Sequence, residues 1–254
     1  MKRNRGRFLG IILLSLFVLL SFMSSGADAF LKSKEPKEKP RVIVVFVDMS
    51  GSTNRDRQTV YRDAFEKIYE NFHQGDRIMV GTITGRSYID FKPAVDVEIP
   101  KKSLWFNRIQ FERKLTATKE KVRGEVTRLL SQKQGTPRTE ILNSLNIADT
   151  IFHNEKREKI LVLLSDMIQD SKEYNFETVN VTNDYINKVI RYRQKHDLIP
   201  DLSGVKVYVV GASGADPNKY RSVERFWTRY FKKTGADFST HRYKHSLISF
   251  EKTT

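Results

Sequence analysis

The chain has 254 residues, of which 39% are hydrophobic, and this suffices for one sizeable domain with a real core or for two small ones. It contains no cysteine, which excludes disulfides, thiolate metal sites and cysteine nucleophiles. The formal net charge of +15 favours anionic partners, such as acidic protein faces, lipid headgroups or nucleic acid. Composition thus predicts a globular body that is stabilised by packing and attracts negative charge.

The first 29 residues differ in composition from the rest. Basic residues precede an unbroken apolar run over 8–22, and small residues follow it up to Ala29. This is the three-part layout of a secretory signal, and cleavage would follow Ala29. Retention as a signal anchor stays open, because the run approaches the roughly 18 residues of a spanning helix. Both outcomes predict an exported body that is periplasmic, secreted or membrane-anchored outside the cytoplasm.

The excess of positive charge belongs to the body as well as to the leader. The leader has a net charge of +3, so the residues from Phe30 onward still carry +12. For an exported protein this favours an acidic protein partner, with membrane-surface contact through basic segments as a further option, and makes nucleic acid unlikely.

The body divides into a charged, proline-bearing linker at 30–40, a domain at 41–243 and a short tail at 244–254. Within the domain, apolar runs and helical periodicity alternate along the chain. Strands are expected at 42–47, 78–84, 94–99, 159–166, 205–210 and 237–243, with a turn at 85–87. Helices are expected at 58–73, 138–153 and 183–195, and around 223–231 before Gly235.

Residues 101–133 mix apolar side chains with many lysines and arginines. One interpretation is a long helix, or two, that covers a face of the sheet, because apolar residues at helical spacing normally belong to a core. The other is a basic aromatic surface for a partner or for lipid headgroups. The helical run ends at Gly135-Thr136-Pro137.

The alternation of strands and helices predicts an α/β fold: a doubly wound, mostly parallel sheet flanked by helices, Rossmann-like, with a short antiparallel edge strand at 94–99. Two of the buried strands close on an acid, at Asp48 and Asp166. In open α/β sheets ligands bind beyond the carboxyl ends of the strands. These acids therefore mark a candidate site.

The loop after the first strand carries three oxygen-bearing side chains at alternate positions, on Asp48, Ser50 and Ser52. Thr136 and Asp166 can add a hydroxyl and a second carboxylate at the same edge of the sheet. Mg²⁺ needs six oxygens in near-octahedral array, so five protein groups leave one position open. Mn²⁺ and Ca²⁺ also accept oxygen ligands.

Two alternatives remain for these side chains. Thr139 competes with Thr136 for the hydroxyl role, although its helical neighbours favour a place at the start of a helix. Serine, threonine and aspartate are also the usual helix-capping residues, so the whole group could cap helices at strand ends instead of binding a cation.

The same residues resemble the von Willebrand factor A domain with its metal-ion-dependent adhesion site. The DxSxS motif is Asp48-Met49-Ser50-Gly51-Ser52, the second loop has Gly135-Thr136, and the third has Asp166 after a buried strand. The similarity covers about 41–243 and extends to Gly211-Ala212-Ser213 and to Phe226-Trp227, as in bacterial members. The resemblance implies that Ser50, Ser52 and Thr136 bind the metal directly or through water. It also implies that Asp48 and Asp166 hold the metal largely through waters, and that an acidic group of the partner takes the open position.

We therefore expect an exported, non-enzymatic interaction module that binds a protein partner through a divalent cation. A metal-dependent hydrolase is an alternative, because an open cation position can activate water, although no general base beyond the ligands is evident. A basic structural domain that binds membrane or nucleic acid is another.

Overall fold

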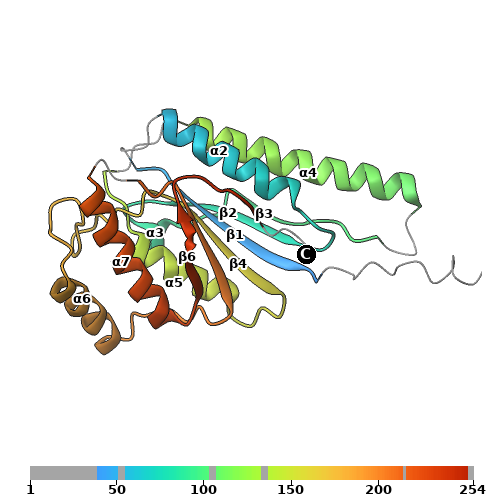
Figure 1. The fold of residues 1–254 in the computed structure, drawn as a ribbon. Helices are drawn as coiled ribbons and strands as arrows, with labels where there is room; N and C mark the ends of the chain where they lie inside the picture. The colour runs from blue at the N-terminus through green and yellow to red at the C-terminus, as the bar shows by residue number, and fades with distance from the viewer. Residues whose placement is uncertain (1–38, 51–54, 103–106, 133–136, 214–215, 251–254) are drawn as a thin grey trace, which may run out of the picture. The chain divides into compact units, whose positions relative to one another are not determined.

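The computed structural model describes residues 39–50, 55–102, 107–132, 137–213 and 216–250. In these ranges a six-stranded sheet has the order β3-β2-β1-β4-β5-β6, in which β1 and β4 are the two central strands (Figure 1). The strands are β1 (Arg41–Asp48), β2 (Arg77–Ile83), β3 (Val95–Glu98), β4 (Glu158–Leu164), β5 (Val205–Val210) and β6 (Asp237–Lys244).

All neighbouring strands pair in parallel except β3, which runs antiparallel to β2 at one edge. This confirms the predicted mostly parallel α/β sheet and its antiparallel edge strand. The strand order reverses between β1 and β4, because the chain winds outward from β1 through β2 to β3 and then returns to β4. Ligands of open α/β sheets bind beyond the carboxyl ends of the strands at such a reversal.

Helices cover both faces of the sheet, as Figure 1 shows. Alternate residues of β1 point to opposite faces, and all eight are buried, as expected for a central parallel strand. Ile43, Val45 and Val47 pack with α2 and α4, whereas Val42, Val44 and Phe46 share a core with α5, α6 and α7. The helices are α2 (Arg55–Glu70), α3 (Ser87–Asp90), α4 (Arg108–Ser131), α5 (Ile141–Phe152), α6 (Asn183–Lys195) and α7 (Pro217–Thr234).

The segment at 101–133 forms a single helix, α4, within its described part. Its inward side chains Phe111, Val122, Val126, Leu129 and Leu130 are buried, which confirms that the helix covers a face of the sheet. Residues 103–106, which contain the tryptophan of the proposed basic aromatic surface, lie outside the described residues.

Several predicted boundaries shift. Helix α2 begins and ends three residues before the predicted 58–73. Helix α5 begins only at Ile141, because Thr139 instead exchanges two backbone hydrogen bonds of 2.9 Å with Asp170. The predicted turn at 85–87 leads directly into the short helix α3 at Ser87.

The two ends of the chain add two observations. The predicted signal segment at 1–29 and the linker up to residue 38 lie outside the described residues. Within the part that the structure describes, no helix is both long and apolar enough to cross a membrane. At the other end, Leu247 and Phe250 from the predicted tail are buried against the core on the α2 side of the sheet.

Glycine is required at position 211, directly after β5. Gly211 has a φ of +98°, and a Cβ there would lie 2.6 Å from Cε1 of Tyr61. Gly204 has a φ of +72°, but nothing lies within 4 Å of its Cβ position. Gly211 thus combines a left-handed backbone with close contact to a fully buried aromatic side chain.

We predict that Gly211→Ala destabilises the protein clearly more than Gly204→Ala. Both substitutions impose a left-handed conformation on alanine, at a cost of about 1–2 kcal/mol. Only Gly211→Ala also forces Tyr61 to move, which adds roughly 1–3 kcal/mol. Urea unfolding of both variants measures the difference, and equal losses would contradict the close packing of Tyr61 on Gly211.

Candidate functional site

Three of the five predicted site residues are described, and the sheet brings all three to the same edge. Asp48 is the last residue of β1, Ser50 follows two positions later, and Asp166 lies two residues beyond β4. Since Val47 pairs with Leu164, the ends of β1 and β4 are adjacent. We call this edge, where the parallel strands end, the carboxyl edge. Ser52 and Thr136 lie outside the described residues.

The Asp48 carboxylate is fully buried and receives hydrogen bonds from both strand ends. Its Oδ1 accepts the backbone N–H of Ser50 at 2.9 Å, and its Oδ2 accepts the hydroxyl of Ser165 at 2.7 Å. Ser165 immediately precedes Asp166, so the Ser165–Asp48 bond locks the two acid-bearing loops together.

The Asp166 carboxylate is also held at both oxygens. Its Oδ1 accepts the backbone N–H of Ile168 at 2.9 Å, and its Oδ2 forms an ion pair with Arg57 at 2.8 Å. The next residue, Met167, adopts a φ of +66°, in the left-handed region that favours glycine. Its carbonyl accepts the indole N–H of Trp227 at 2.8 Å, so α7 supports this strained turn.

The burial of two neighbouring carboxylates makes it costly in free energy to keep Asp48 ionised in the folded chain. Burial, together with the nearby charge of Asp166, raises the pKa of Asp48 to about 6, although hydrogen bonds from Ser165 and Ser50 act in the opposite direction. A raised pKa means that the folded chain holds the charged form of Asp48 at a cost. A cation at this edge would lower that cost.

Tyr61 places an unpaired polar atom next to these charges. Its side chain is fully buried, and its hydroxyl has no hydrogen-bond partner in the described part of the chain. Burial raises the pKa of Tyr61 well above its usual range, and the charges of Asp48 and Asp166 raise it further. Buried hydroxyls are normally bonded, so Tyr61 keeps an unsatisfied oxygen at the carboxyl edge that a bound group could engage.

Sequence reasoning missed Arg57, Tyr61, Ser165 and Trp227 as members of this network. Arg57 and Tyr61 are four residues apart in the first turns of α2, and thus lie on the same face of the helix. That spacing, directly after the DxSxS loop, was the available signal. Tyr61 and Trp227 also belong to the buried apolar faces of α2 and α7, which hides their polar atoms from a periodicity argument.

The segment after Thr136 can be placed, although Thr136 itself cannot. The backbone N–H of Glu140 donates to Thr84 just beyond β2, at 3.0 Å, and Thr139 pairs with Asp170 in the segment after Asp166. Gln169 accepts the N–H of Leu142 at 3.0 Å and so caps the start of α5. The described segment from Thr139 to Leu142 therefore lies at the carboxyl edge.

The donors at this edge suit a hard divalent cation. Two carboxylates and a serine hydroxyl supply oxygen, the ligand atom that Mg²⁺, Mn²⁺ and Ca²⁺ take in proteins. Among the described residues, no three acidic or histidine side chains gather. The negative charge of the site hence comes from Asp48 and Asp166, and the remaining ligands would be hydroxyls or water.

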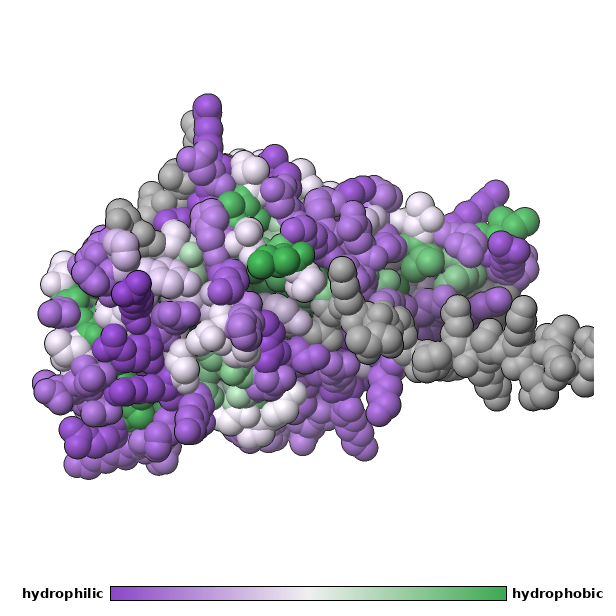
Figure 2. Space-filling model, in the orientation of Figure 1, coloured by the Kyte–Doolittle hydropathy of each residue, from purple (hydrophilic) through white to green (hydrophobic). Residues whose placement is uncertain are grey.

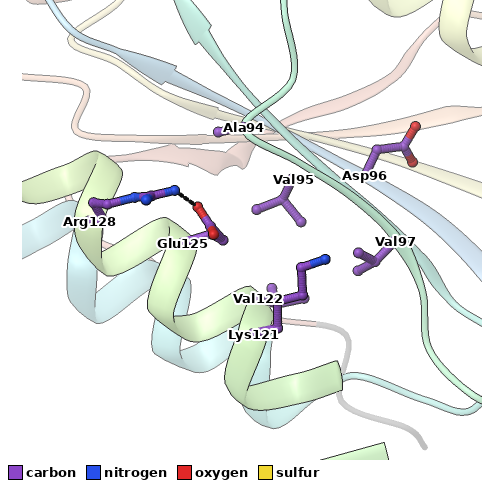
Figure 3. A pocket seen from close by; sticks show the side chains of 8 residues that line it. All are labelled: Ala94, Val95, Asp96, Val97, Lys121, Val122, Glu125 and Arg128. Atoms are coloured by element: carbon purple, nitrogen blue, oxygen red, sulfur yellow. Dashed lines mark hydrogen bonds and ion pairs between the residues drawn. The ribbon is translucent and has the colours of Figure 1, made fainter. Parts of the chain in front are cut away.

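A cavity of about 370 Å³ lies elsewhere, between β3 and α4 (Figure 3). Glu125 and Arg128 on its α4 wall form an ion pair with each other. Its walls contain none of the predicted site residues. Its two acids, Asp96 and Glu125, are ion-paired with Arg77 and Arg128 and their side chains are 37% and 31% exposed. The cavity therefore offers no counterpart of the buried acids at the carboxyl edge.

No protein-family model matches the chain, and no curated protein matches it. Among solved structures, the pilus adhesin SpaC from Lactobacillus rhamnosus GG in its open conformation is 14% identical, with a TM-score of 0.44, over 85% of this chain and 29% of that one. The manganese-loaded TRAP protein of Plasmodium vivax is 14% identical, with a TM-score of 0.39, over 74% of this chain and 63% of that one. A von Willebrand factor type A protein from Catenulispora acidiphila is 11% identical, with a TM-score of 0.39, over 78% and 42%. This chain therefore spans less than two thirds of each of these proteins.

We predict that Asp48→Asn stabilises the metal-free protein at pH 8 and not at pH 4. The folded pKa of about 6 exceeds the ordinary value of 3.8, so wild type gains stability as the pH falls through this window, whereas the neutral amide gains none. The gap at pH 8 should be of the order of 2–3 kcal/mol. Urea midpoints in chelator at several pH values measure it.

Asp237→Asn is the control for this experiment. The Arg242 guanidinium beside Asp237 lowers the pKa of that carboxyl, so removing its charge should weaken the fold at neutral pH. A stability gap for Asp48→Asn that does not change between pH 4 and pH 8 would contradict the raised pKa of Asp48.

We also predict that Tyr61→Phe raises the stability of the metal-free protein by about 1 kcal/mol, because it removes an unsatisfied buried hydroxyl. Tyr230→Phe is the matched control. The Tyr230 side chain is equally buried, but its hydroxyl accepts the Nε–H of Arg193 at 2.9 Å, so its loss should destabilise. Thermal unfolding in chelator measures both signs, and a loss at Tyr61 would indicate a bonded hydroxyl.

Proposed function

We propose that this chain is an exported, non-enzymatic interaction module that binds a protein partner through a divalent cation at the carboxyl edge. Asp48, Ser50 and Asp166 would hold the cation, together with Ser52 and Thr136 from the adjoining loops. When bound, the cation supplies a positive centre that can accept a carboxylate of the partner. In this proposal the chain belongs with the von Willebrand factor A domains that its motifs resemble.

The observation that carries the proposal is the buried, mutually repelling pair Asp48 and Asp166 at the point where the strand order reverses. Folding places both acids there at an electrostatic cost. A sheet edge without a binding role would gain nothing from that cost. The hydroxyls of Ser50 and Tyr61 near this pair add neutral oxygens without adding charge. This donor set favours a hydrated divalent cation over a catalytic acid–base pair.

A row of arginines along α7 supports an acidic partner. Helix α7 begins shortly after β5 ends, and Arg221, Arg225 and Arg229 recur along it at every fourth position. None of the three forms an ion pair with a described acidic residue. The face of the molecule in Figure 2 is mostly hydrophilic, with small, separate apolar patches. Such a surface speeds encounter with an acidic protein more than it supports a large apolar interface.

We predict that Asp48→Asn abolishes binding of Mg²⁺ and Mn²⁺ in calorimetry while the fold is retained. A neutral amide removes one of the two charges that hold the cation. Asp237→Asn, at the opposite edge of the sheet, should bind the metal as wild type does.

Affinity capture from the native host should likewise retain an acidic partner with Mg²⁺ and lose it with chelator or with Asp48→Asn. Full capture in chelator would refute the proposal.

A further inference from the structure

Arg57 brings a positive charge of the chain itself into the carboxyl edge. It lies in the first turn of α2, and its Nη1 is 2.8 Å from Oδ2 of Asp166. The side chains are 16% and 8% exposed, so the pair is largely shielded from water. Shielding strengthens an ion pair relative to one on the surface.

The geometry of Asp166 makes this ion pair consequential for the metal. One carboxylate oxygen is already engaged by the N–H of Ile168, and Arg57 engages the other. A cation, or a water molecule of its hydration shell, that approaches Asp166 must therefore share or replace the guanidinium. The same positive charge also repels a divalent cation, because both would lie within a few ångströms of one carboxylate.

We infer that Arg57 is the internal counter-cation of the site: it neutralises Asp166 in the metal-free protein and competes with the divalent cation for that carboxylate. This inference rests on the proposed metal-binding function. Arg57 thereby sets the metal affinity, and the exchange of Arg57 for the metal links occupancy of the site to the position of the first turn of α2.

Arg57 is suited to this exchange by its place at the rim of the site. Its side chain is partly exposed, in contrast to Arg41, whose guanidinium is 3% exposed and pairs with the fully buried Asp76 at the other end of β1. A long, partly exposed arginine can swing into water without leaving a buried charge unpaired on its own side. The carboxylate that it leaves would be compensated by the arriving metal.

The test is calorimetric titration of Mg²⁺ and of Mn²⁺ into wild type, Arg57→Gln and the control Arg55→Gln. Both substitutions remove one positive charge from the first turn of α2, but Arg55 is exposed and has no described bond between its side chain and Asp166. Arg57→Gln should bind the metal roughly tenfold more tightly or better, since an adjacent opposite charge commonly changes the affinity of a carboxylate for a proton by about one to three powers of ten. Arg55→Gln should change the affinity less than about twofold, as expected of a screened surface charge.

Thermal unfolding gives a readout that separates competition from a merely structural role. In chelator, Arg57→Gln should melt below wild type, because Asp166 loses its counter-charge. At saturating Mg²⁺ the two should melt at the same temperature, because the metal then supplies that charge. A structural role alone would lower both melting temperatures equally. Arg57→Met, which keeps the methylene stem, replaces Arg57→Gln if the latter does not fold.

The outcomes are distinct. Equal metal affinity of wild type and the Arg57 variants, or weaker binding by the variants, overturns the inference and leaves the proposed function standing. Binding by the variants alone supports the inference and indicates that Arg57 keeps the wild-type site metal-free. If none of the folded proteins binds either metal, the proposed function falls and the inference falls with it.

Discussion

The hydrogen bond from the hydroxyl of Ser165 to Asp48 is the interaction on which the carboxyl edge depends. It joins residues 117 apart in the chain and connects the ends of β1 and β4, which are adjacent where the strand order reverses. The hydroxyl of Ser165 also accepts the backbone N–H of Met167 at 2.9 Å, and so shapes the turn around Asp166. One serine thus connects Asp48 to the turn that carries Asp166.

A buried carboxylate lies at each end of β1, and the two differ in the charges and hydrogen bonds that surround them. At the amino end, Asp76 receives the guanidinium and backbone N–H of Arg41 and the backbone N–H of His73. At the carboxyl end, Asp48 receives one hydroxyl and one amide and has a second carboxylate nearby, which contributes to its raised pKa. A buried acid without a compensating charge costs more free energy than one that is paired and hydrogen-bonded. Of these two acids, the one with the less compensated charge, Asp48, thus lies at the edge where we propose that a cation binds.

Much of the fold followed from the sequence because its strands are short apolar runs that end in punctuating residues. The parallel sheet, the edge strand at Val95–Glu98 and the arrival of Asp48 and Asp166 at one edge could all be predicted in this way. The start of α5 could not, since the pairing of Thr139 with Asp170 is a long-range contact that overrides local helical preference. Leu247 was missed for a similar reason: a lone apolar residue near a chain end has no periodicity, and only the packed core shows that it is buried.

The sequence motif identifies only the candidate ligands of the site. The residues that govern the charge of the site belong to no motif. The role of Ser165 is recognisable only once the sheet brings β4 beside β1, and the spacing of Arg57 and Tyr61 on α2 does not by itself identify Asp166 as the partner of Arg57. Their contacts also bear on the alternative that these acids and hydroxyls merely cap helices. Helix α2 begins at Arg55, and the helix after Asp166 begins only at Asn183, whereas the carboxylates bond to Ser165, Ile168 and Arg57. Capping would place the acids at the first turn of a helix, exposed and unopposed by like charge. Two acids connected through a strand-end serine, with an arginine beside one of them, are instead the arrangement on which our proposal of cation exchange at this edge rests.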